Sequence, residues 1–415
     1  MTVSEAQNTK MVIRPLQYRD LEAIEALVEQ TSDTNCQSYA INPSRQVEQV
    51  RNWYGILKFL RLFPNPYQHD FCLYVAELEQ QILGLIQVKP FNITRSTWKI
   101  EYVLVNNCLP VQEIALSKLE TGSQLLRHCL ETIWEARTWV LEVNIHDQST
   151  LGLYRQNGFQ PLAQMTYWAI TPELIAQLAQ QDPDLPNLLP VSNADAQLIY
   201  QLDTVSMPPQ VRQVFDRHVQ DFKMSFNQAL LTNLKRFYER TEVIKGYVFE
   251  PQRKAAIGYF HLQSCQDGSQ PHKAELTVHP AYTWLYPKLL AQMAQIVNKL
   301  PNQSLQLASA DYQSEREEYL EQLGAQSTEH TLLMSRSVWH KLRETKRIEG
   351  LQWSEVLQGL QPARTPIPSR ISWWKLHPPF HYHHPFAQDR TQSAQITTNG
   401  IVKRKGELNQ ESSND

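Results

Sequence analysis

Residues 138–159 read TWVLEVNIHDQSTLGLYRQNGF and carry the strongest local structural signal in the chain. The first eight residues are mostly apolar and rich in β-branched side chains, which is typical of a strand in the middle of a sheet. The residues that follow predict a helix that ends at Gly158, because glycine is the usual residue just beyond a helix C-terminus. In such a helix, Leu153 and Phe159 pack against the sheet.

The chain contains an internal repeat. A series of landmarks in the first half recurs in the same order between about 175 and 164 positions later. The matched landmarks are Asp20 with Asp195, Gly84 with Gly258, Lys99–Val105 with His272–Val278, Leu125 with Leu289, and Gly158 with Gly324. Two unrelated α/β segments would not keep these landmarks in step, so the repeat indicates a duplicated domain.

Each half is predicted as strand, helix, helix, hairpin, strand, helix, strand, helix and strand pair. In the first half we expect the second helix across 44–62 and the hairpin across 73–88. The strand across 138–145 follows between two helices. The predicted organisation is a domain over 11–170 (copy one), a linker over 171–187, a second domain over 188–338 (copy two), an extension over 339–386 and a disordered tail over 387–415.

Composition excludes several classes of protein. The 415 residues include 39 Lys and Arg against 42 Asp and Glu, so no basic field favours nucleic acid or a membrane as a partner. The chain has no apolar run of membrane-spanning length, and its first residues lack the pattern of a signal peptide. The five cysteines, which show no CxxC spacing, fit reduced thiols and a cytoplasmic location. They are Cys36, Cys72, Cys108, Cys129 and Cys265.

The order of elements, together with the ending LYRQNGF, resembles the GCN5-related N-acetyltransferase (GNAT) superfamily. The resemblance is closer over 13–170 than over 188–338. It implies an α/β (α+β) fold of two tandem domains, each a mixed, mostly antiparallel sheet flanked by helices. It also implies transfer of an acetyl group from acetyl-CoA to a primary amine of a protein or a small molecule. The alternative is a non-catalytic scaffold or ligand sensor with this fold.

The resemblance places two candidate catalytic residues in copy one. Tyr154 stands where family members often have the acid that protonates the departing thiolate, a role that suits a phenol. Glu101 heads the strand where the family usually places the base that takes the proton of the amine, although a solvated carboxylate at a strand edge is the plainer reading. Main-chain N–H groups over Val103, Leu104 and Val105 are expected to polarise the thioester carbonyl.

The expected site for the pyrophosphate of the cofactor is incomplete in copy one. The family pattern is Arg/Gln-x-x-Gly-x-Gly/Ala, whereas residues 117–122 read SKLETG. Gly122 matches one of the two glycines and Glu120 replaces the other, which brings a carboxylate toward an anion. The cofactor-binding candidates are Lys118, Thr121, Gly122 and Ser123 here, the main chain of Val103–Val105, and Asn144 after the fifth strand.

Copy two departs further from the family pattern. Trp284 and Pro287 stand in its equivalent loop and helix start, and Leu320 replaces Tyr154. We therefore expect copy two to be degenerate and to pack against copy one, shape an acceptor groove or form a dimer surface. The histidines over 377–384 match no zinc-ligand spacing, so no metal is expected. The acceptor amine is a protein N-terminus, a lysine or a small molecule, and a homodimer stays open.

Overall fold

The computed structural model describes residues 11–32, 72–106, 118–224 and 240–339. The expectations that lie outside the described residues are the helix across 44–62, the tail over 387–415 with nearly all of the 339–386 extension, the histidines over 377–384, and the cysteines at 36 and 108. Within the described ranges the chain has a mixed α/β fold, in which helices flank a mixed sheet.

Copy one supplies six strands and three described helices. They are β1 (Val12–Pro15), α1 (Leu21–Ser32), β2 (Cys72–Leu78), β3 (Gln81–Pro90), β4 (Thr97–Val105), α3 (Lys118–Thr132), β5 (Thr138–Asn144), α4 (Gln148–Gln156) and β6 (Gln160–Ile170). The hairpin expected across 73–88 is confirmed, with a turn at Glu79 and Gln80. The strand expected across 138–145 is also confirmed as β5.

Copy two repeats this order. Its described elements are β7 (Leu188–Pro190), α6 (Ala196–Ser206), α7 (Pro209–Phe215), a 3₁₀ turn (Val219–Phe222), β8 (Thr241–Glu250), β9 (Ala255–Cys265), β10 (His272–Val278), α9 (Leu285–Val297), β11 (Leu305–Ala310), α10 (Ser314–Leu323) and β12 (Gln326–Ser337). Gly84 and Gly258, matched by sequence, have the same structural role in the two copies, because a helix packs closely against each of them. A Cβ on Gly84 would lie 3.2 Å from Leu125 of α3, and one on Gly258 would lie 3.0 Å from Leu289 of α9.

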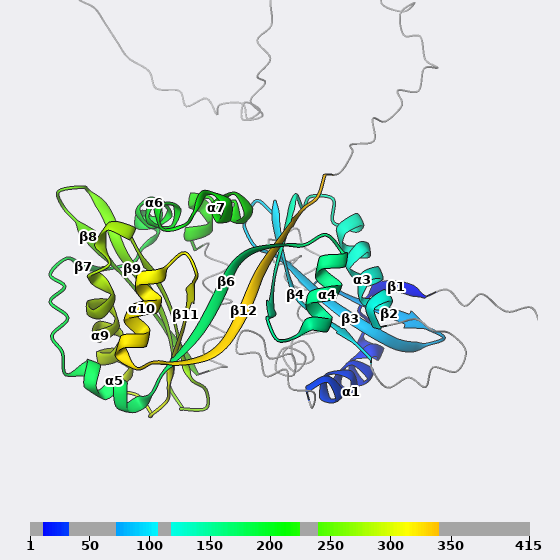
Figure 1. Cartoon of the computed structure of the whole chain (residues 1–415), viewed down its shortest axis with the longest axis horizontal. Coiled ribbons are helices and arrows are strands. Elements are labelled where there is room, and N and C mark those ends of the chain that lie inside the picture. Colours follow the sequence, from blue (N-terminus) through cyan, green and yellow to red (C-terminus); the bar gives the residue numbers. More distant parts are fainter. Residues whose placement is uncertain (1–10, 33–71, 107–117, 225–239, 340–415) are drawn as a thin grey trace, which may run out of the picture. The chain divides into compact units, whose positions relative to one another are not determined.

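The described strands form one sheet in the order β1-β2-β3-β4-β5-β12-β6-β11-β10-β9-β8-β7. The two copies therefore exchange their last strands. β12 of copy two inserts between β5 and β6 of copy one, and β6 also pairs with β11 of copy two. Figure 1 shows β6 and β12 side by side between the two halves. The expected strand pair within each half is wrong, because each copy ends in a single long strand that pairs with the other copy.

The expected linker over 171–187 contains a helix. Thr171 caps helix α5 (Pro172–Ala179) by accepting the N–H of Leu174, and Pro172 begins the helix. This pairing of a threonine cap with proline in the first turn is a standard helix start. Ile175 and Leu178 are buried in the copy-two core, so the helix belongs to that core.

Helices cover both faces of the copy-one half of the sheet. Ile100 and Trp139 pack on one face with Leu125 and Leu126 of α3. Tyr102 packs on the other face with Leu21, Ile24 and Leu27 of α1. We call these the α3 face and the α1 face.

Candidate functional site

The parallel strands β4 and β5 pair only at their beginnings. The paired residues run from Thr97 opposite Thr138 to Ile100 opposite Leu141, while β4 continues to Val105, paired among the described strands with β3 alone. We call the point beyond Ile100 and Leu141, where the strands part, the fork of copy one. The main chain of Val103, Leu104 and Val105 runs along its open side. Unpaired strand edges offer N–H and C=O groups to a ligand.

A bulge in β4 lies at the fork. β3 pairs Val88 with Ile100 and Gln87 with Tyr102, so Glu101 is an extra residue without a partner on β3. A bulge of this kind interrupts the alternation of side chains. Tyr102 lies on the α1 face, and Glu101 joins Lys89 and Lys99.

Two lysines surround the Glu101 carboxylate. Its Oε1 lies 2.7 Å from Nζ of Lys89 and 3.7 Å from Nζ of Lys99, and its side chain is only 4% exposed. Burial works to raise the pKa of the Glu101 carboxyl. The ammonium groups of Lys99 and Lys89 outweigh this effect and hold the pKa below the ordinary value of 4.5. Glu101 is therefore ionised at neutral pH and has a low affinity for protons.

Two buried polar atoms flank Glu101. Among the described residues, Oε1 of Gln87 and the hydroxyl of Tyr102 have no hydrogen-bond partner, although both side chains are only 7% exposed. Burial, together with the charge of Glu101, raises the pKa of the Tyr102 phenol. Buried polar groups in folded proteins nearly always have partners, so two neighbouring exceptions suit a bound ligand. Gln87 was not anticipated, although a glutamine in the apolar run Ile82–Val88 was a readable signal.

Copy two completes the other side of the fork. Glu142 follows Leu141, the last residue of β5 that pairs with β4, and accepts hydrogen bonds from the hydroxyls of Tyr167, at 2.7 Å, and of Thr331 in the exchanged strand β12. Asn144, a cofactor candidate, instead donates to Oε1 of Glu329 in β12 at 3.0 Å. The exchanged strand thus holds the polar residues of β5 in place. It also adds the buried carboxylate of Glu329, which, like that of Glu142, lies near Tyr167.

The structure gives Tyr154 a buried position in α4. Its side chain is 4% exposed and meets Phe159 edge to face, with ring centroids 5.8 Å apart. Burial raises the pKa of the Tyr154 phenol, and the nearby charge of Asp147 adds to the effect, so the hydroxyl is protonated at neutral pH. Leu153 and Phe159 are buried, and Gly158 has a φ of 78°, as expected for the end of this helix.

The candidates at the start of α3 pack against α4. A Cβ on Gly122 would lie 2.9 Å from a methyl group of Leu153, and Ser123 accepts a hydrogen bond of 2.9 Å from Asn157. Thr121 is buried and Glu120 is exposed. The Lys118 side chain lies outside the described residues. The contact with Leu153 accounts for the glycine at 122 without a phosphate.

An arginine closes the equivalent fork of copy two. β10 and β11 pair up to Ala274 and Leu307 and then part. The guanidinium of Arg316, from the first turn of α10, donates to the carbonyl oxygens of Leu276 in β10 and of Ala308 in β11, the latter at 2.9 Å. The Arg316 side chain is buried, and its charge lies over the ring of Tyr286 at 5.6 Å.

Copy one has no arginine at the equivalent position. Both Arg316 and Thr150 are the third residue of their helix, after Gln313 and Asp147 respectively, so Thr150 corresponds to Arg316. Copy two also lacks the bulge, because β10 pairs with β9 without a shift in register. The two forks thus differ: one has a bulge and a small residue, and the other is crossed by a buried cation.

The described residues show neither of two other kinds of site. No three His, Cys, Asp or Glu side chains within them converge in a way that could hold a metal ion. None of the helices they form has the length and apolar character needed to cross a membrane.

Known proteins resemble this chain in structure and not in sequence. No family model matches it, and no curated protein does. A tandem GNAT protein from the clavulanic acid biosynthesis pathway has a similar structure, with a TM-score of 0.52 and 12% identity over 80% of this chain and 100% of that chain. A GCN5-related N-acetyltransferase from Sphaerobacter thermophilus gives a TM-score of 0.45 and 13% identity over 79% of this chain and 95% of that chain. The chain therefore has the tandem GNAT fold.

Proposed function

We propose, from this tandem GNAT fold, that copy one transfers an acetyl group from acetyl-CoA to a primary amine and that copy two does not. The contrast between the two forks carries the proposal. In copy one the strands part at a bulge that bears Glu101. The α4 residue that corresponds to Arg316 is Thr150, whose side chain is too short to cross the fork. In copy two the Arg316 guanidinium joins the two strands across the fork.

The residues at the copy-one fork suit the donor. The open edge of Val103–Val105 offers main-chain groups to the amides of an extended pantetheine arm, as a neighbouring strand would. The first N–H groups of a helix favour an anion, so the N-terminus of α3 suits a pyrophosphate. Acetyl-CoA supplies an activated acyl carbon and a thiolate leaving group.

The α1 face of the fork suits the acceptor. An amine needs hydrogen-bond acceptors, and Oε1 of Gln87, the carboxylate of Glu101 and the hydroxyl of Tyr102 offer them within one buried patch. The neighbouring Glu142 and Glu329 add negative charge that favours a cationic acceptor.

The proposed reaction includes two proton transfers, one from the amine nitrogen and one to the sulfur. The amine nitrogen bonds to the acyl carbon, the bond from that carbon to sulfur breaks, and the hydroxyl of Tyr154 donates a proton to the sulfur. Glu101 takes the proton that the nitrogen loses, directly or through water. Because the pKa of Glu101 is lowered, it is a weak base, so the amine must reach the site largely uncharged.

One observation favours the alternative, a scaffold or ligand sensor with this fold. Gly122 and Ser123, expected at the pyrophosphate, are occupied by Leu153 and Asn157. Calorimetry of the full chain with acetyl-CoA separates the two functions. Binding, followed by release of free thiol with a panel of primary amines, supports the transferase. A folded protein that gives no heat at about 1 mM acetyl-CoA contradicts it.

A further inference from the structure

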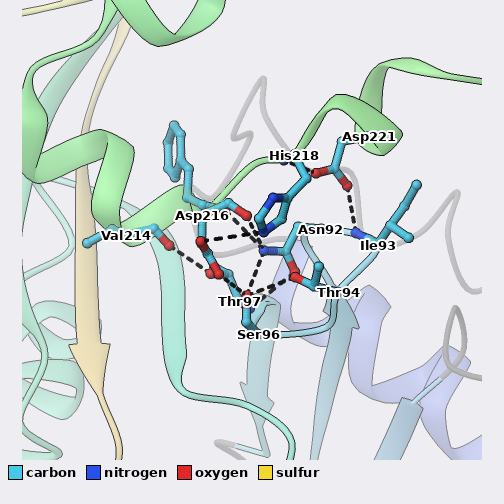
Figure 2. A network of polar contacts seen from close by, with 10 residues as sticks. Asn92, Ile93, Thr94, Ser96, Thr97, Val214, Asp216, His218 and Asp221 are labelled. Carbon is cyan, nitrogen blue, oxygen red and sulfur yellow. Dashed lines mark hydrogen bonds and ion pairs between the residues drawn. The ribbon is translucent and has the colours of Figure 1, made fainter. Parts of the chain in front are cut away.

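A loop of copy one is fixed to copy two by a network of polar contacts (Figure 2). The side chain of Asn92, between β3 and β4, donates to the carbonyl oxygen of Asp216 at 2.8 Å, and the Ser96 hydroxyl donates to the Asp216 carboxylate at 2.5 Å. The Thr97 hydroxyl donates to the carbonyl oxygen of Val214 at 2.7 Å. These contacts hold the loop of copy one in a fixed position against copy two, and we call the loop the wall.

A second contact extends this wall. The Asp221 carboxylate accepts the N–H groups of Ile93 and His218, both at 2.6 Å, and so joins the copy-one loop to the 3₁₀ turn of copy two. Because both of its oxygens are engaged in this way, Asp221 has a structural role.

The wall borders a cavity of about 460 Å³ over strands β8, β9 and β10. This volume lies within the roughly 300–1,000 Å³ of small-molecule sites. Apolar side chains from both copies form one part of its lining. They include Phe91, Ile93, Ile199, Leu202, Phe222 and Met224.

Charged side chains form the floor of the cavity. Lys245, His261 and Glu275 are cross-strand neighbours on β8, β9 and β10, and all three line the cavity. Nδ1 of His261 lies 3.3 Å from the Glu275 carboxylate, and the Glu275 side chain is 78% exposed. The hydrogen bond with His261 lowers the pKa of Glu275, so this carboxylate is charged at neutral pH.

Arg217 and Asp203, which also line the cavity, form an ion pair. Nη1 of Arg217 lies 2.9 Å from Oδ1 of Asp203. The Arg217 guanidinium also lies 5.2 Å from the ring centre of Phe91 and 6.0 Å from that of Phe222, which ties it to the apolar wall. A ligand in the cavity therefore meets the Glu275 carboxylate, the cationic side chains of Lys245, Lys223 and Arg95, and an aromatic and aliphatic wall.

We propose that this cavity of copy two binds a small zwitterion of dipeptide size with apolar side chains. The ligand ammonium lies against Glu275, its carboxylate lies toward Lys245, and its side chains lie against Phe91, Leu202 and Phe222. This site is separate from the copy-one fork, and Arg316 closes the fork beside it, so we infer binding without acyl transfer.

Calorimetry of the full chain tests this site with leucyl-leucine, N-acetyl-leucyl-leucine and leucyl-leucine amide. We expect leucyl-leucine to bind, and the loss of either charged terminus to weaken binding about tenfold or more. Glu275→Gln removes the anion without disturbing the core, since the side chain is exposed. We expect it to weaken leucyl-leucine about tenfold, whereas Glu321→Gln, an exposed carboxylate of α10 outside the cavity, leaves binding unchanged.

Three results would overturn the proposal. They are no heat with leucyl-leucine at about 10 mM, equal affinity for the N-acetylated dipeptide, and unchanged binding in both Glu275→Gln and Lys245→Gln. Acetyl-CoA titrations of the same variants keep this test distinct from that of the acetyltransferase. Donor binding that persists in Glu275→Gln while leucyl-leucine is lost supports two independent sites. Failure of acetyl-CoA to bind says nothing against the dipeptide.

Discussion

Nζ of Lys89 lies 2.7 Å from Oε1 of Glu101, and this contact sets how strong a base the carboxylate can be. Because the pKa of Glu101 lies below 4.5, the carboxylate is already ionised at neutral pH, and a titration near pH 6 or 7 is not expected from it. The acceptor amine, with a pKa near 10, limits the rate instead. We predict that kcat/KM for acetyl transfer rises continuously from pH 6 to about pH 9, as measured by thiol release.

Two variants check the role of Glu101. Glu101→Gln removes the proton acceptor and should lower kcat about 100-fold. Lys89→Met removes one ammonium, so the pKa of Glu101 should rise and a limb should appear at the acid end of the pH profile. A wild-type rate that levels off near pH 6 would contradict the effect of the two lysines on Glu101.

Tyr154→Phe removes the proposed acid and keeps the ring that meets Phe159. We predict a fall in kcat of about tenfold to 100-fold, because the leaving thiolate loses its proton donor, with little change in the Kd of acetyl-CoA by calorimetry. Tyr319→Phe, in the equivalent helix of copy two, is the matched control and should leave kcat unchanged. Equal rates for wild type and Tyr154→Phe would leave Tyr154 with only its packing role.

Much of the local structure could be predicted from the sequence. Gly84 and Gly258 mark the repeat because a helix approaches each of them closely, and Gly158 and Gly324 mark helix ends because both have positive φ. These are local constraints that require glycine at one position, so they are visible in the sequence. The start of α5 at Thr171 was equally readable.

The exchange of β6 and β12 could not be predicted in the same way. A strand's alternation shows which face is buried and does not show which strand lies beside it. The bulge at Glu101 is hidden for a related reason, because IEYVLV fits a regular strand as well as a bulged one. Nothing in SEREEYLEQL distinguishes Arg316, which is buried, from the exposed charges around it. Of the residues that form the fork, only Glu101 and the main chain of Val103–Val105 were among the sequence candidates.

Arg14 and Asp20 form a paired contact that should govern the acid stability of copy one. Two nitrogens of the Arg14 guanidinium lie 2.6 and 2.8 Å from the two carboxylate oxygens of Asp20, whose side chain is 4% exposed. Burial works to raise the pKa of Asp20, but the hydrogen bonds from Arg14 and from the N–H of Gln17 outweigh it and lower the pKa below 3.8. This stabilisation is present above pH 3.8 and is lost as the pH falls through the folded-state value.

We predict that Asp20→Asn lowers the free energy of unfolding by about 3 kcal/mol at pH 7, because it leaves Arg14 without its buried partner. Urea titrations at pH 7 and near pH 3 measure the difference. The gap between wild type and variant should shrink at the lower pH, where Asp20 in the wild type gains a proton. A gap that is the same at both pH values would mean that the charge of Asp20 is not what stabilises the turn.

Thr150→Arg should convert the fork of copy one into that of copy two. The new guanidinium would start from the same third position of its helix as Arg316. Matching the paired residues of the two forks places the carbonyl oxygens of Val103 and Glu142 where Arg316 finds those of Leu276 and Ala308. We predict that acetyl-CoA binds at least about tenfold more weakly to this variant, since the donor and the arginine would need the same main-chain groups.

Thr150→Ser is the matched control, because it keeps a small hydroxyl residue and should bind acetyl-CoA like the wild type. The reverse change, Arg316→Thr, leaves two buried carbonyl groups without a donor and should lower the free energy of unfolding by about 2 kcal/mol. Calorimetry gives the affinities, and thermal unfolding confirms that the variants are folded. If Thr150→Arg is folded and binds acetyl-CoA as tightly as the wild type, the donor does not lie in the fork.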